Sequence, residues 1–457
     1  MKLIQRIVTP IAARVGAFDR YNPDADGPIS RQSEILVWWI SATLWFAILS
    51  EKIALPPFNI EICFFAGIGL VAMLFYRGLL VIEQKRAVGF FIFCTILLGE
   101  QLFTPFRESF SVPGVLAAMC YYVIFMFVAP LEKAAVFRIM RNFVGITTLV
   151  AFLVYVDWIF NLTHHALPNM DKILPDDFLF LHYVYVQPVH WASPYTKPNA
   201  FFMLEASHTS QMLAMGIIAE FCTRQNLARL AFLFLALLST YAGTGFLMLL
   251  AVGPFLLPRA KSSTLMIAAM VVPLIIGGAA AKGLLNDYLA RSTEFNQQGA
   301  SANQRFVWPY QLAWQQLNSG AHDAYLGIGA SNSAYDARLP VFIKGRPNGA
   351  PAYGTPTKLL IEFGIFVAVV WSAYFWIILA RGAVPLPIIA MIWIQYEALN
   401  GGLLVPVQIL YCYLLCAIYV KPNPRWRVSS RLADYVAPAA TPMAMATASR
   451  GAPYSRS

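Results

Sequence analysis

The stretch LLIEFGIFVAVVWSAYFWIILA, residues 359–380, decides the fold class of this chain. Glu362 is its only charged residue. A helix of about 20 mostly apolar residues spans the ~30 Å hydrocarbon core of a bilayer. This stretch is long enough and apolar enough, so it is predicted to be a transmembrane helix.

The same composition extends over most of the chain. Hydrophobic residues make up 58% of the sequence and charged residues 12%, whereas a soluble domain has about 25% charged residues. We therefore predict an all-α polytopic membrane protein with about twelve transmembrane helices. The predicted spans are residues 35–54, 62–82, 87–103, 112–130, 143–160, 201–222, 227–242, 246–257, 264–281, 359–380, 386–399 and 403–420.

The basic residues indicate the orientation, because cytoplasmic loops of membrane proteins retain Lys and Arg. With the N-terminus inside, every inner connection is basic, and the short outer turns carry only Lys52 and Arg107. The prediction is a cytoplasmic segment over residues 1–34, a bundle over 35–420 and a disordered cytoplasmic tail over 421–457. The net charge of +10 is then a signal of topology and gives no reason to expect nucleic acid as a partner.

Two connections, residues 161–200 and 282–358, are much longer than the other turns and are predicted to lie outside the cytoplasm. Long loops in compact proteins are usually functional or disordered, and the aromatic residues of these two indicate ordered structure. Residues 302–317 are predicted to form an amphipathic helix with Pro309 in its first turns or at a kink. All six cysteines lie in or beside predicted spans, which argues against disulfides.

A polar stripe occurs in the predicted span 201–222. Glu205, His208 and Gln211 recur every three residues, so they share one helix face near its outer end. Polar groups at membrane depth are functional candidates. The alternative is a set of hydrogen bonds that joins neighbouring helices.

Other acidic residues lie near the outer ends of predicted spans. Glu362 follows Lys358 by one helical turn, which predicts either an interfacial ion pair or the mouth of an outward-facing cavity. Glu100, Glu397 and Asp157 lie at similar predicted depth. Together they suggest a polar vestibule, although each residue alone is explained equally well by helix capping.

The second long loop contains four arginines, Arg291, Arg305, Arg338 and Arg346. Guanidinium groups bind phosphate in bidentate fashion and remain charged, so the loop suits a polyanion such as pyrophosphate. Solvated surface charge is the alternative. All six histidines are also predicted to lie outside the cytoplasm, which places acid–base chemistry there. The adjacent pair at 164–165 lacks further ligands at metal spacing, and no metal site is predicted.

Several short motifs occur in a recognisable order: NQRFVW (303–308), YLGIG (325–329) and PTKLLIEFGI (356–365). This order resembles the periplasmic loop and following helix of the O-antigen polymerase and ligase superfamily. EASH (205–208) and STYAGTG (239–245) resemble the start of a central span and a tight helix hairpin in that family. Ligases of the family carry a His just before the last long helix, where this chain has AYGT (352–355).

The resemblance implies a GT-C-like bundle in the bacterial inner membrane that polymerises oligosaccharides linked to undecaprenyl pyrophosphate, without a cofactor. The lipid-linked oligosaccharide is both donor and acceptor, and a regulator of chain length is a further partner that the family allows. We predict catalytic roles for Glu205, His208 and Glu362. The other predicted contacts are Arg291, Arg305, Arg346 and Lys358 for pyrophosphate, and Gln211, Trp308 and Tyr353 for substrate.

Two alternatives remain open from the sequence. One is a ligase that transfers a finished glycan to a lipid or protein acceptor. The other is a transporter or flippase, a class that often shows inverted repeats and broken helices near the bilayer midplane. No repeat is evident, and the polar residues cluster toward the predicted outer face, which favours an enzyme.

Overall fold

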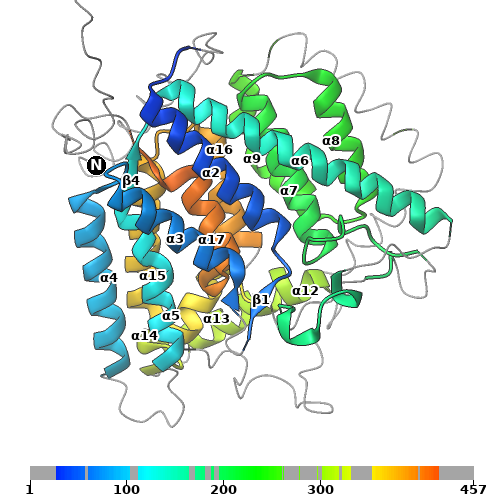
Figure 1. Cartoon of the computed structure of the whole chain (residues 1–457). Helices are drawn as coiled ribbons and strands as arrows, with labels where there is room; N and C mark the ends of the chain where they lie inside the picture. The colour runs from blue at the N-terminus through cyan, green and yellow to red at the C-terminus, as the bar shows by residue number, and fades with distance from the viewer. Residues whose placement is uncertain are drawn as a thin grey trace, which may run out of the picture.

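The computed structural model describes residues 27–56, 60–102, 112–163, 170–180, 187–189, 195–259, 301–318, 322–330, 352–399 and 402–420, and the single positions 261, 277 and 296. This part of the chain is mostly helical, as predicted (Figure 1). Three helices are long and apolar enough to cross a membrane: α2 (Arg31–Leu49), α6 (Lys133–Leu162) and α15 (Thr355–Arg381). Each exposes large apolar side chains, among them Trp38, Phe152 and Val369, as lipid-facing helices do.

The other helices coincide with the remaining predicted spans, but most are too short to cross a bilayer as regular α-helices. The span predicted at residues 264–281 lies outside the described residues except for position 277. The structure therefore supports helical, membrane-crossing segments without establishing about twelve of them. These helices are α3 (Ile62–Tyr76), α4 (Gln84–Leu102), α5 (Val112–Tyr122), α7 (Ala206–Cys222), α8 (Leu227–Ser239), α9 (Thr244–Leu256), α16 (Leu386–Ile394) and α17 (Pro406–Cys412).

Several helices are short because their apolar runs continue in another backbone conformation. Helix α5 passes into the 3-10 turn η2 (Val123–Met126) and strand β4 (Phe127–Pro130). Helices α16 and α17 continue as π-helical turns, η8 (Gln395–Leu399) and η10 (Tyr413–Ala417). Hydropathy reports composition alone, so it predicted the apolar runs but not these changes of geometry.

Two small sheets mark opposite ends of the bundle. At one end, β4 pairs antiparallel with β3 (Val81–Ile82) and parallel with β5 (Tyr419–Val420). Helices α2 and α6 begin there and α15 ends there with Arg381, which pairs with Glu83 at 3.0 Å. We call this the basic end.

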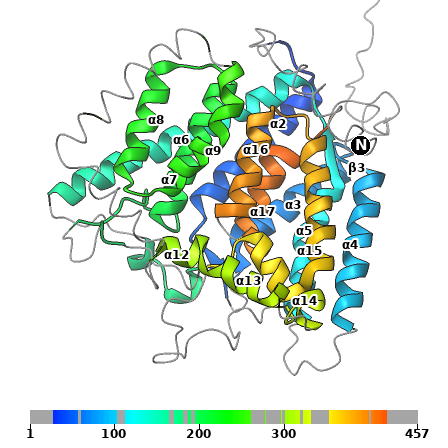
Figure 2. The same ribbon diagram turned by 180° about the vertical axis from the view of Figure 1, so that it is seen from behind.

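The opposite end carries β1 (Ala54–Leu55), β2 (Ile60–Glu61) and three short helices, α12 (Ser301–Phe306), α13 (Trp308–Asn318) and α14 (His322–Leu326). Figures 1 and 2 show α12–α14 at the end of the bundle opposite β4, below α2, α16 and α17 in these views. We call these three helices the roof. The predicted helix 302–317 is therefore divided at Val307, and Pro309 lies in the first turn of α13, where it is tolerated.

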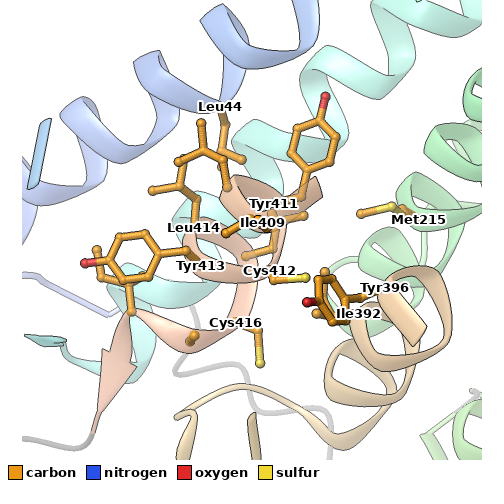
Figure 3. Packing of buried hydrophobic residues seen from close by; sticks show 14 of the residues in the cluster. Leu44, Met215, Ile392, Tyr396, Ile409, Tyr411, Cys412, Tyr413, Leu414 and Cys416 are labelled. Atoms are coloured by element: carbon orange, nitrogen blue, oxygen red, sulfur yellow. The ribbon is translucent and has the colours of Figure 1, made fainter. Parts of the chain in front are cut away.

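The apolar core is centred on α17 and η10. Figure 3 shows Tyr411, Tyr413 and Leu414 from this segment near Leu44 of α2 and Met215 of α7. All residues from Pro406 to Val420 are buried, so most of the last predicted span, residues 403–420, runs through the interior of the bundle.

The roof is held by a break in α15. Gly364 has a positive φ of 73°, which interrupts the helix and frees the carbonyl groups of the preceding turn. The Ile361 carbonyl accepts from the backbone N–H of Ile328 at 2.7 Å, and the Glu362 carbonyl accepts from Gly329 N–H at 2.9 Å. The two sequence motifs YLGIG and LIEFG therefore contact each other backbone to backbone.

A second close contact joins α7 to the α8–α9 turn. Thr244 donates to the Ser207 carbonyl at 3.0 Å, and the Gly245 N–H donates to Ser210 Oγ at 3.1 Å. Helix α8 ends at Ser239 and α9 begins at Thr244, so the predicted tight hairpin at residues 239–245 is present. It fixes the first turns of α7, which carry the polar stripe.

Replacing Gly245 with alanine is expected to destabilise the protein by about 1–3 kcal/mol, because the new methyl group would overlap the Ser210 carbonyl. Thermal unfolding in detergent would measure the effect. Gly253→Ala in the same helix is the matched control, since no atom lies within 4 Å of a methyl group there. Equal melting temperatures for the two variants would contradict the expectation.

Candidate functional site

Glu205 and Arg305 form an ion pair at the roof end of the bundle. Glu205 is the residue before α7, in extended conformation, and its Oε2 accepts from the Arg305 guanidinium at 2.8 Å and from Ser207 Oγ at 2.7 Å. The carboxylate is buried, whereas Arg305 is partly exposed on α12. A guanidinium oriented by a buried carboxylate is a fixed positive charge at the bundle surface.

His208 lies one turn further into α7 and contacts Glu51. Its Nδ1 is 2.7 Å from Glu51 Oε1, and both side chains are buried. A neutral imidazole that donates Nδ1–H to a carboxylate carries its lone pair on Nε2, so the pair fixes the tautomer that acts as a base there. The Glu51 carboxylate would also stabilise the imidazolium once formed.

Glu61 and Tyr411 lie near Glu51, and Gln211 follows His208 by about one turn of α7. We call Glu51, Glu61, Gln211 and Tyr411 the inner cluster. Glu51 lies close enough to Glu61 and Tyr411 for electrostatic interaction. Each of the four has at least one buried polar atom without a hydrogen-bond partner in the described part of the chain. Buried polar groups in native proteins are satisfied by protein or ordered water, so the inner cluster is suited to hold bound water.

The loop before α7 is positioned by a separate set of polar contacts. Lys52 donates to the Phe201 carbonyl at 2.7 Å, and Asp157 at the end of α6 accepts from the Asn199 N–H at 3.0 Å. Phe201 has a positive φ of 67°, so the chain turns sharply just before Glu205. These contacts place Glu205 beside Arg305 and explain the burial of Asp157, one of the predicted vestibule residues.

The third predicted catalytic residue belongs to a different neighbourhood. Glu362 is fully buried beside Lys358, whose Nζ lies 4.0 Å from its Oε1, under the Gly327–Gly329 turn. The predicted substrate contacts Trp308 and Tyr353 pack around Leu312, Ala313 and Ile361 between α13 and α15, so they have a structural role in holding the roof.

Several predicted residues lie outside the described part of the chain. These residues are the predicted pyrophosphate ligands Arg291 and Arg346, the loop residue Arg338, and the histidines His164, His165, His182 and His190. Of the four predicted pyrophosphate ligands, Arg305 and Lys358 lie in the described part of the chain. The structure brings Glu205, His208 and Arg305 into one region, and the functional roles of these and of the other residues stay predictions.

Sequence reasoning missed Glu51 and Glu61. Glu51 and Lys52 fall inside the predicted span 35–54, and charged residues within an apolar span are functional candidates by default. The sequence alone could therefore have identified Glu51 as a candidate. In the structure α2 ends at Leu49, and residues 53–55 turn into a bridge and strand β1, which corrects the predicted end of this span.

Described residues include no group of three or more His, Cys, Asp or Glu side chains arranged to hold a metal ion. The chemistry offered by the described residues of the region is that of a fixed guanidinium, an imidazole oriented by a carboxylate, and a second carboxylate. No model of a known protein family matches the chain, and a search of proteins with established functions also finds no match.

Proposed function

We propose that this protein is a membrane glycosyltransferase that polymerises oligosaccharide units linked to a polyprenyl pyrophosphate such as undecaprenyl pyrophosphate. The observation that carries the proposal is the proximity of the Glu205–Arg305 ion pair and the Glu51–His208 pair at the start of α7. One pair supplies positive charge for a phosphate leaving group and the other supplies a base for a sugar hydroxyl.

The proposed reaction uses both pairs in one step. The acceptor hydroxyl oxygen attacks the anomeric carbon of the donor, the bond from that carbon to the pyrophosphate oxygen breaks, and His208 Nε2 takes the hydroxyl proton. The Arg305 guanidinium stabilises the negative charge that develops on the departing pyrophosphate. Proton transfer to a base and charge stabilisation on the leaving group need no further reactant.

The proposal includes an orientation in the bilayer. The basic end would face the cytoplasm, since Arg86, Lys133 and Arg381 gather there, and the roof would face outward in a bacterial inner membrane. The chain would then cross the membrane about twelve times with both termini inside. Lipid-linked sugars are presented to such an enzyme from within the bilayer, and helices that border the lipid, such as α2, suit that delivery.

Reconstitution tests the proposal. The purified protein in vesicles would receive lipid-pyrophosphate-linked oligosaccharide extracted from the source cells, with and without an acceptor lipid, and products would be separated by gel electrophoresis. The wild type is expected to produce a ladder of lengthened glycans. The Arg305→Ala variant is expected to produce much less of it, and the Glu362→Gln variant is assayed alongside for comparison. Transfer only to the acceptor lipid would instead identify a ligase. Movement of substrate across the vesicle membrane without any transfer would identify a transporter and overturn the proposal.

Glu51→Gln is expected to lower the turnover rate by about 10- to 100-fold with little change in donor KM. The amide keeps the size of the side chain but loses the charge that orients His208 and stabilises its imidazolium. Initial rates over a range of pH would measure the effect. Glu51→Asp is the control that retains the charge, and a rate for Glu51→Gln equal to that of the wild type would argue against His208 as the base.

A further inference from the structure

Glu397 is a buried carboxylate that the proposed reaction does not use. It lies in the π-helical turn η8 at the roof end of α16 and is 4% exposed. Its Oε2 has no hydrogen-bond partner among the described residues. Burial of an unpartnered carboxylate is unfavourable, and π-helical turns occur frequently at functional sites. Both features indicate a group that is completed by a ligand.

The turn that carries Glu397 is held firmly beneath the start of α15. Thr355 Oγ1 donates to the Tyr396 carbonyl at 2.7 Å, and the Tyr396 hydroxyl is hydrogen-bonded to that of Tyr122. Gly354 lies directly against the Glu397 carbonyl: a methyl group on Gly354 would lie 3.1 Å from that oxygen. Neighbours on both sides therefore fix the backbone of the turn that carries Glu397.

Tyr310 of the roof helix α13 lies near Glu397. Burial raises the pKa of the Tyr310 phenol, and the negative charge of Glu397 adds to the shift, which places the two groups within electrostatic range. Tyr310 is nevertheless 45% exposed. An aromatic ring that is open to solvent thus lies within electrostatic range of a buried carboxyl group.

We propose that Glu397 and Tyr310 form the binding site for the acceptor sugar, a proposal that rests on the glycosyltransferase function above. The Glu397 carboxyl group has two oxygens that can form hydrogen bonds with hydroxyl groups of a sugar ring. The Tyr310 ring offers an apolar face to the sugar and a hydroxyl at its edge. Helix α16 packs against α7, and Glu205 at the start of α7 holds Arg305, so Glu397 and the Glu205–Arg305 pair lie at the roof end of adjacent helices.

Steady-state kinetics and direct binding test this site together. The probe is the lipid-free oligosaccharide repeat unit, used as acceptor at varied concentration with a fixed amount of lipid-linked donor. Glu397→Gln is expected to raise the acceptor KM by about tenfold, the equivalent of losing one hydrogen bond, with donor KM unchanged. Tyr310→Phe is expected to raise it less. Tyr325→Phe, an exposed roof tyrosine that stacks on Phe366, is the matched control.

Equilibrium dialysis of the same labelled oligosaccharide separates the two proposals. A wild type that binds the oligosaccharide more tightly than Glu397→Gln, yet transfers nothing, overturns the proposed function and supports the sugar site. A wild type that transfers glycan, with equal acceptor KM and equal binding for Glu397→Gln, overturns the sugar site alone. Thermal unfolding of each variant confirms that the fold is retained.

Discussion

Replacement of Arg305 with alanine is expected to lower the rate of glycan transfer by about 100- to 1000-fold, the usual effect of removing one group that stabilises transition-state charge. Arg305 is held at 2.8 Å by Glu205, so its charge is positioned before the substrate arrives. Initial rates in reconstituted vesicles would measure the loss. Arg305→Lys is expected to recover part of the rate, because lysine keeps the charge but loses the bidentate geometry.

Arg229→Ala provides the matched control for this prediction. Arg229 also pairs with a buried glutamate, Glu220, at 3.3 Å, but at the basic end of the bundle. The Arg229→Ala substitution removes the same kind of ion pair far from the proposed site. The transfer rate is therefore expected to remain within about twofold of the wild type while stability falls. Equal losses of activity in Arg305→Ala and Arg229→Ala would assign Arg305 a structural role only.

The fold was predictable where it depends on composition. Apolar runs such as residues 359–380 are long enough to dictate helices, and α2, α6 and α15 overlap the spans that the sequence predicted. The geometry of the shorter segments was not predictable, because π-helical turns such as Gln395–Leu399 depend on packing between helices and leave no periodic signal in one sequence. For the same reason the end of α2 was placed five residues too late.

The site was predictable only along one helix. The three-residue spacing of Glu205, His208 and Gln211 placed them together because helical geometry is local. Their partners come from far along the chain: Glu51 is 157 residues from His208, and Arg305 is 100 residues from Glu205. Nothing local in a single sequence relates such positions, so the pairing emerged only from the structure.

Gly364→Ala is expected to cause the largest loss of stability of any single substitution considered, about 3–5 kcal/mol. Gly364 has a φ of 73°, which an alanine adopts only with strain, and an added methyl group would overlap the backbone carbonyl of Tyr325. Neither backbone can move without breaking the hydrogen bonds that Ile328 and Gly329 make with α15. Thermal unfolding and the yield of monodisperse protein in detergent would measure the loss.

Two further variants make the cause of that loss specific. Gly327→Ala places a methyl group against the backbone of Glu362 from the opposite side of the same contact, so it is expected to behave like Gly364→Ala. Gly69→Ala in α3 meets no atom within 4 Å and is expected to be neutral or slightly stabilising, since alanine favours the helix. If Gly364→Ala unfolded at the temperature of Gly69→Ala, the roof would not depend on the break in α15. If Gly364→Ala and Gly327→Ala both lose stability while Gly69→Ala does not, the glycines of YLGIG and LIEFG are required because two backbones approach too closely for any side chain.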